Sequence, residues 1–130
     1  MKSLHISQGR LEYHTRWVLL VCDEGVVDFY QWLYTKKTGV KIHKSKFGSH
    51  ISVVRGHEEG IEEGWWERNE NGPEIQFSYS NEMRWSEPIE GVSYVWLDVQ
   101  SDGLEKVRTD LGLCAKPPFD FHLTVGRRNH

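Results

Sequence analysis

The chain has little cysteine and no long apolar run. Its two cysteines, Cys22 and Cys114, are too few and too far apart in sequence for a disulfide framework or a zinc site. We therefore expect both to be reduced thiols in the core. No apolar run approaches the ~18 residues that a membrane-spanning helix needs, and the mean hydropathy is -0.61, which argues against a membrane protein.

The N-terminal residues also lack the apolar segment of a signal peptide. The sequence therefore predicts a cytoplasmic protein, a location that includes a viral protein acting in the cytoplasm of its host. Aromatic residues are abundant in contrast, because six Trp, five Tyr and five Phe supply large buriable side chains, which argues against a disordered chain. The 130 residues suit one domain, spanning 1–130, and leave little room for a second.

A large excess of one charge is absent as well, but the charges are unevenly distributed. The net charge is -3, with five lysines and no acidic residue from Lys36 to Lys46, and seven glutamates and one arginine from Glu58 to Glu74. The acidic block argues against a broad surface for a long polyanion, whereas the lysines are compatible with a small anion site. Lys44 and Lys46 are candidates for contact with phosphate; the alternative is that they are solvated surface residues.

The hydrophobic pattern predicts the order strand, helix, strand twice. Apolar runs and polar–apolar alternation mark the strands, while helical spacing, a polar start and a final glycine mark the helices. The predicted elements are strands over 16–22 and 49–55 around a helix that ends at Gly39, and strands over 93–100 and 119–127 around a helix that ends at Gly112. Residues 56–91 between the two units are expected to form a hairpin-like insert.

Each unit ends in the same pattern, H-x-[S/T]-V-x-R. HISVVR begins at His50 and HLTVGR begins at His122, whereas a third H-x-[S/T] match, at His5, lies outside both units and is interpreted as accidental. Residues i and i+2 of a strand project to the same face, so Ser52 lies beside the first motif histidine and Thr124 beside the second. If the two units pair, two imidazoles and two hydroxyls meet in one concave site.

Two imidazoles and two hydroxyls suit the cleavage of a phosphodiester without a metal. A neutral imidazole can accept the proton of an attacking hydroxyl or water, an imidazolium can protonate the leaving oxygen, and a pKa of ~6.5 permits both near neutral pH. The hydroxyls can donate hydrogen bonds to the phosphoryl oxygens. The alternative is two hydrogen-bonded core histidines in an unrelated α+β protein. A metal site is disfavoured, because no carboxylate stands at ligand spacing from either histidine.

The paired motifs in duplicated units resemble the 2H phosphoesterase superfamily. It includes RNA 2',3'-cyclic phosphodiesterases, enzymes that degrade 2',5'-oligoadenylates, and phage enzymes that degrade cyclic-nucleotide alarm signals and so evade host immunity. The active-site residues that the resemblance implies, without a metal or another cofactor, are His50, Ser52, His122 and Thr124. We also expect an α+β fold in which two pseudo-symmetric strand–helix–strand lobes form a concave antiparallel-sheet active site.

Two arginines, Arg55 and Arg127, each follow a motif histidine by five residues. This odd spacing directs them to the opposite face of a regular strand, where they would form ion pairs at the strand edge. A bend in the strand, which Gly126 permits in the second motif, would instead bring the arginine to the phosphate of a substrate.

Aromatic residues are the candidates for holding a nucleobase, because bases stack on aromatic rings. Trp65 and Trp66 lie in a loop rich in Glu and Gly, where they either stack on a ligand or pack over the insert. Trp17, Trp32 and Trp96 fall within predicted strands and helices and are expected in the core.

Together these features predict a metal-independent phosphodiesterase that acts on a small nucleotide. Its substrate class would be a cyclic di- or oligonucleotide signal or a 2',5'-linked oligoadenylate, with no membrane or metal partner. The alternatives are an RNA 2',3'-cyclic phosphodiesterase that processes RNA ends, and a non-catalytic nucleotide-binding module. The sequence indicates no particular oligomeric state.

Overall fold

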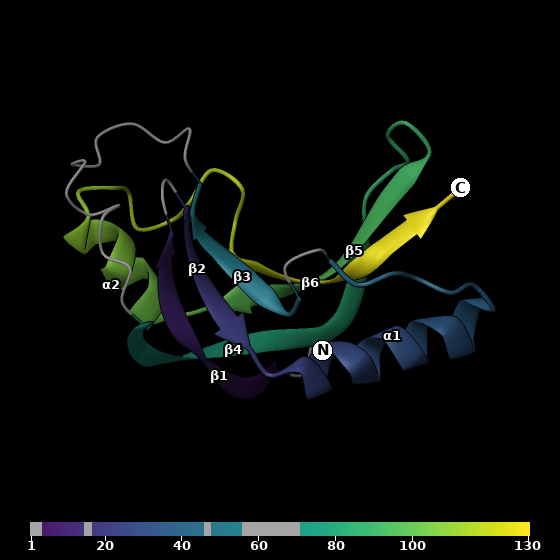
Figure 1. Ribbon diagram of the computed structural model, residues 1–130, viewed down its shortest axis with the longest axis horizontal. Coiled ribbons are helices and arrows are strands. Elements are labelled where there is room, and N and C mark those ends of the chain that lie inside the picture. Colours follow the sequence, from purple (N-terminus) through teal and green to yellow (C-terminus); the bar gives the residue numbers. More distant parts are fainter. Residues whose placement is uncertain (1–3, 15–16, 46–47, 56–70) are drawn as a thin grey trace.

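The computed structural model describes residues 4–14, 17–45, 48–55 and 71–130 (Figure 1). The strands and helices that these residues form are, in order, β1 (Leu4–His14), β2 (Trp17–Cys22), α1 (Glu24–Thr38), β3 (His50–Val54), β4 (Asn71–Trp85), β5 (Val92–Gln100), α2 (Asp102–Asp110) and β6 (His122–Asn129). The order strand, helix, strand therefore occurs twice, as β2-α1-β3 and as β5-α2-β6, in agreement with the sequence pattern.

Local signals set the boundaries of the two helices. The Asp23 side chain accepts a hydrogen bond from the backbone N–H of Gly25 at the start of α1, and Gly39 follows that helix with a left-handed φ of 74°. At the start of α2, the hydroxyl of Ser101 accepts from the N–H of Leu104 at 3.2 Å. These contacts satisfy backbone groups that a helix end leaves without partners. Neither of the two described helices is long and apolar enough to cross a membrane.

The strands form a closed antiparallel barrel in the order β1-β2-β3-β6-β5-β4. This barrel corrects the expectation of two open lobes that form a concave sheet between them. The difference lies in β1 and β4, which pair with each other. β1 also pairs with β2 and β4 also pairs with β5, so the two strands together join the outer edges of the two units. Few residues of β1 are apolar, and in this strand only Gly9 and Leu11 are buried, so its sequence does not indicate a strand.

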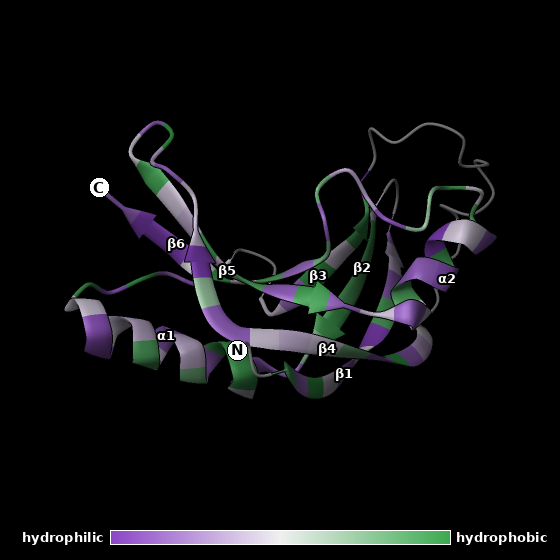
Figure 2. Cartoon of the chain, turned by 180° about the vertical axis from the view of Figure 1, so that it is seen from behind, coloured by the Kyte–Doolittle hydropathy of each residue, from purple (hydrophilic) through white to green (hydrophobic). Residues whose placement is uncertain are grey.

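The core lies on one face of the paired motif strands and extends to both helices. Ile51 of β3 and Leu123 of β6 are fully buried in it, together with Leu20 of β2 and Leu104 of α2. Figure 2 shows β2 as almost wholly apolar, whereas apolar and polar residues alternate along α1. Trp32 lies on the outer side of α1 and is 56% exposed, so its predicted place in the core is wrong.

The two cysteines lie in different environments. Cys22 is buried, and this burial raises the pKa of its thiol to about 12, which keeps it protonated and inert. Cys114 is exposed after α2, contrary to the expectation that both thiols lie in the core.

The start of β5 and the end of β6 extend beyond the body of the barrel as a two-stranded ribbon near the C-terminus (Figure 1). In this ribbon, Tyr94 of β5 lies directly opposite Arg127 of β6. The ribbon matters for the site, because both side chains line the cavity described next.

Candidate active site

The two motif strands are neighbours in the barrel. β3 and β6 pair in antiparallel fashion with Ile51 opposite Leu123, and both of these side chains point into the core. The residues on either side of this pair therefore share the other face of the strands, namely His50, Ser52, His122 and Thr124. In this register each histidine lies opposite the hydroxyl residue of the other motif. The two histidines are diagonal neighbours, for which a spacing of about 7–8 Å is typical.

All four residues line one cavity of about 660 Å³. Pockets of about 300–1,000 Å³ are typical of sites for small molecules and cofactors, so the volume suits a nucleotide. The predicted pairing of the two motifs around one concave site is therefore present, although it is built on the wall of a closed barrel rather than between open lobes.

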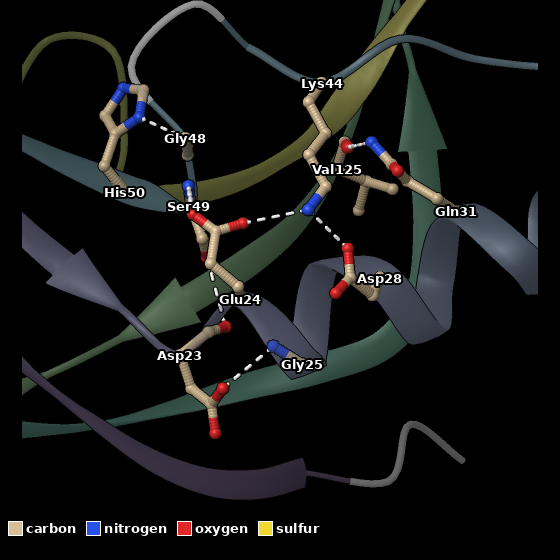
Figure 3. A network of polar contacts seen from close by, with 10 residues as sticks. All are labelled: Asp23, Glu24, Gly25, Asp28, Gln31, Lys44, Gly48, Ser49, His50 and Val125. Atoms are coloured by element: carbon tan, nitrogen blue, oxygen red, sulfur yellow. Dashed lines mark hydrogen bonds and ion pairs between the residues drawn. The ribbon is translucent and has the colours of Figure 1, made fainter.

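Each motif histidine is held through Nδ1 by a backbone carbonyl two residues earlier. Nδ1 of His50 lies 3.0 Å from the carbonyl oxygen of Gly48 (Figure 3), and Nδ1 of His122 lies 3.0 Å from that of Asp120. A carbonyl oxygen only accepts, so Nδ1 carries the proton and Nε2 is the nitrogen that takes up or releases a proton. Gly48 and Asp120 both have left-handed backbones, with φ of 74° and 47°, and this turns each carbonyl toward its ring.

Both strands carry a one-residue bulge inside the motif. β3 bulges at Val53, because adjacent residues of β2 pair with the residues on either side of it. β6 bulges at the equivalent Val125 against β5 for the same reason. An extra residue shifts the alternation of faces by one position. Arg55 and Arg127, although at odd spacing from the histidines, therefore line the cavity rather than the opposite face of a regular strand. Their predicted contact with the phosphate of a substrate stays a prediction.

Each arginine lies near an aromatic residue of the cavity wall. The guanidinium of Arg55 lies 4.0 Å from the ring centroid of Phe119, an arrangement that holds a flat cation in place. Arg127 lies opposite Tyr94, which is 52% exposed and also lines the cavity. The cavity thus combines positive charge with exposed aromatic surface, as a site for a nucleotide requires.

Burial lowers the pKa of the His122 imidazole, and the positive charges of Arg55 and His50 lower it further. The hydrogen bond to the Asp120 carbonyl acts in the opposite direction but does not outweigh them. Because charge on Arg55 and His50 acts on His122, the three groups share one electrostatic environment. His122 is therefore neutral near neutral pH, which is the form that accepts a proton.

Two tryptophans lie beside the motif histidines. The ring of Trp17 meets that of His50 edge-on with 5.6 Å between centroids, and the rings of Trp96 and His122 are 6.3 Å apart. Both tryptophans are half-buried and line the cavity, so their predicted place in the core is wrong. β2 is apolar on both faces, and its pattern does not show which face Trp17 takes.

A polar network on β5 fixes the second of these tryptophans. Trp96 Nε1 donates to the Asp98 carboxylate at 3.2 Å, and Arg84 donates to the same carboxylate at 3.0 Å. This cavity-lining face of β5 was not predicted from the sequence. Tyr94, Trp96 and Asp98 stand at a spacing of two, so the alternation that placed the motif residues on one face could have indicated it.

The remaining predicted residues either lie outside the described residues or make contacts elsewhere. Lys46, Trp65 and Trp66 lie outside the described residues. Lys44 forms ion pairs with Glu24 and Asp28 of α1 (Figure 3), so its charge is partnered at the surface rather than directed at a phosphate. His5 stacks on Tyr79 of β4, and the match at this position is no part of the cavity.

Across the ranges that the structure describes, no group of three or more His, Cys, Asp and Glu side chains is arranged to hold a metal ion. Comparisons of the chain with models of known protein families, with curated proteins and with solved structures find no match.

Proposed function

We propose that the protein is a metal-independent phosphodiesterase in which His122 and His50 act as general base and general acid. One observation carries the proposal. Two imidazoles, each fixed through Nδ1 by a left-handed residue, line one nucleotide-sized cavity together with two hydroxyls and two arginines. Two histidines with a purely structural role in the core would not be expected to line such a cavity. The same geometry at both motifs supports the resemblance to 2H phosphoesterases.

In the proposed reaction, Nε2 of His122 accepts the proton of the attacking oxygen. This oxygen belongs to water or to the ribose hydroxyl next to the reacting linkage, which is the 2'-hydroxyl for a 3',5' linkage and the 3'-hydroxyl for a 2',5' linkage. That oxygen forms a new bond to phosphorus, and the bond from phosphorus to the leaving oxygen breaks with its electron pair on the leaving oxygen. Nε2–H of His50 then gives its proton to the leaving oxygen. His122 is assigned as the base because its pKa is lowered by burial and by the charges of Arg55 and His50.

The hydroxyls and arginines act on the phosphoryl oxygens. Each hydroxyl lies opposite the histidine of the other motif, where Ser52 and Thr124 can donate hydrogen bonds to the two non-bridging oxygens. Arg55 and Arg127 add positive charge to the cavity, which can stabilise the negative charge that develops in the transition state. Acid–base transfer of this kind contributes about 10²–10⁴-fold to the rate.

The walls of the cavity favour a substrate with a nucleoside on each side of the reacting phosphorus. Trp17 lies at His50, while Trp96 and Tyr94 lie toward the ribbon, so aromatic surface is present at both histidines. A cyclic di- or oligonucleotide, or a 2',5'-linked oligoadenylate, has this form and is the proposed substrate class. A 2',3'-cyclic phosphate at an RNA end has a nucleoside on one side alone.

A substrate panel tests the proposal. The protein is incubated with cyclic dinucleotides, 2',5'-oligoadenylate and 2',3'-cyclic nucleotides, with and without EDTA, and products are separated by chromatography. We expect turnover of a substrate from the first two groups that survives EDTA and is lost in both His50→Ala and His122→Ala. His5→Ala is the matched control, because His5 belongs to the same H-x-S sequence pattern but lies away from the cavity.

The other outcomes separate the alternatives. Turnover of 2',3'-cyclic nucleotides alone would replace the proposed substrate class with RNA-end processing. Binding of a nucleotide without turnover would contradict the enzyme and support a non-catalytic module. Turnover that needs a metal ion would contradict the two-histidine mechanism.

A further inference from the structure

The carbonyl of each bulge residue accepts a hydrogen bond from a helix of the other unit. Gln31 of α1 donates from Nε2 to the carbonyl of Val125 in β6 at 2.8 Å (Figure 3). Arg108 of α2 donates from Nη1 to the carbonyl of Val53 in β3 at 2.8 Å. Since α1 belongs to the unit of β3, and α2 to the unit of β6, the two contacts cross between the units.

A bulge residue needs such a donor. It interrupts the regular ladder of backbone bonds, and a buried carbonyl without a partner destabilises the strand in that geometry. Arg108 meets this need from the interior, because it is only 1% exposed and its Nε also donates to the Cys114 carbonyl at 2.8 Å. A guanidinium so deeply buried is stable only where its donors are matched to acceptors.

A second set of contacts, from the backbone of His43, restricts the conformation of β6 next to its bulge. The backbone N–H groups of His43 and Arg127 each donate to the carbonyl of the other at 2.9 Å. A Cβ at Gly126 would lie 2.7 Å from the His43 carbonyl oxygen and 3.3 Å from Nε2 of Gln31. Glycine at this position therefore allows both contacts to be made next to the bulge.

We propose that Gln31 and Arg108 are positioning residues that hold the two bulges and so keep Arg127 and Arg55 on the cavity face. Without the bulge, alternation along β6 would turn the Arg127 side chain to the opposite face of the strand. The role in substrate binding rests on the proposed function, whereas the placement of the arginine does not. Each half of the cavity thereby depends on the helix of the other half.

The test replaces Gln31 with leucine, which has a similar size and no donor. In nuclear magnetic resonance spectra, we expect the wild type to show contacts between the Arg127 side chain and the Tyr94 ring, and Gln31→Leu to lose them. With the substrate that the panel identifies, KM should rise about tenfold while kcat changes less, because a contact to a charged group is lost. Thr35→Ala, one turn along α1, is the control and should leave both unchanged.

A double-mutant cycle shows whether Gln31 acts through the arginine. If it does, Gln31→Leu in the background of Arg127→Ala has no further effect on KM. Unchanged contacts in Gln31→Leu, or effects that add fully in the double variant, would overturn the proposal. Gln31→Glu, which keeps the size and replaces the amide donor with a carboxylate, is the second variant if the leucine variant unfolds. If the wild type shows no turnover, the proposed function fails, and the Arg127–Tyr94 contacts alone decide this inference.

Discussion

At the scale of single residues, the backbone two positions before each histidine decides which imidazole nitrogen reacts. Gly48 and Asp120 adopt the left-handed conformation that turns their carbonyls to Nδ1. Glycine reaches this conformation without strain, and aspartate tolerates it better than most residues. The sequence shows no shared residue type at these positions, so this common geometry could not be predicted from the motifs.

Gly48→Ala tests this geometry. The new Cβ would face a φ of +74° and would lie 2.6 Å from Oε1 of Glu24, so we expect a loss of about 1–2 kcal/mol in the free energy of unfolding and a lower kcat. Asp120→Gly removes the strain at the equivalent position and should keep both stability and activity. Urea unfolding and steady-state kinetics measure the two effects. A fully stable and active Gly48→Ala variant would contradict the account.

The pH dependence of the reaction follows from the environment of His122. Its pKa lies below 6.5, so the acid limb of the kcat/KM profile should lie below that value. The charge of Arg55 contributes to the lowering, and Arg55→Gln should therefore move the acid limb upward toward 6.5. The profile of kcat/KM against pH measures both. An acid limb that stays in place or moves downward in Arg55→Gln would show that Arg55 does not act on the base.

At the scale of elements, the sequence predicts the helices and most strands because their signals are local. The cap at Asp23, the left-handed Gly39 and the serine cap at Ser101 all lie within a few residues of the helix ends that they set. The bulges at Val53 and Val125 could not be predicted, because a bulge is a relation between neighbouring strands. The sequence therefore left open whether the two arginines face the cavity or the opposite side of the strand.

Gly126→Ala and Asp23→Ala distinguish a residue that maintains the site from a residue that only stabilises a helix. Gly126→Ala places a Cβ 2.7 Å from the His43 carbonyl beside the bulge, so both the free energy of unfolding and kcat/KM should fall. Asp23→Ala removes the cap of α1 and should cost about 1 kcal/mol of stability with little change in kcat/KM. Chemical denaturation and kinetics on the same preparations compare the two variants. Equal losses of kcat/KM would contradict this separation.

At the scale of the whole molecule, closure of the barrel depends on the strand that the sequence pattern did not reveal. β1 pairs along β4 from Leu4 opposite Ser80 onward, and this pairing joins the two units at the edges away from the motifs. The motifs themselves could be predicted, because alternation fixes which residues share a face. The two motifs meet because the two units pair at β3 and β6. The place of Trp17 in the cavity wall could not be predicted, because β2 is apolar on both of its faces.

The lowered pKa of His122 also predicts how the stability of the whole protein changes with pH. Between the folded-state pKa and the ordinary value of 6.5, the unfolded chain binds a proton at this residue that the folded protein does not bind. The free energy of unfolding should therefore rise with pH across this window, be lowest below it and gain nothing further from this residue above 6.5. Urea unfolding from about pH 5 to pH 8 measures the dependence. His122→Asn should flatten it, and an identical slope in the variant would contradict this assignment.

The most direct measurement of the central claim is a crystal structure of the protein with a non-hydrolysable phosphorothioate analogue of the substrate that the panel identifies. The account predicts one phosphorus between the two motif strands, with its oxygens at about 2.6–3.2 Å from Nε2 of both His50 and His122. An analogue whose phosphorus contacts one of these imidazoles alone, or that binds with its phosphorus away from both, would contradict the account.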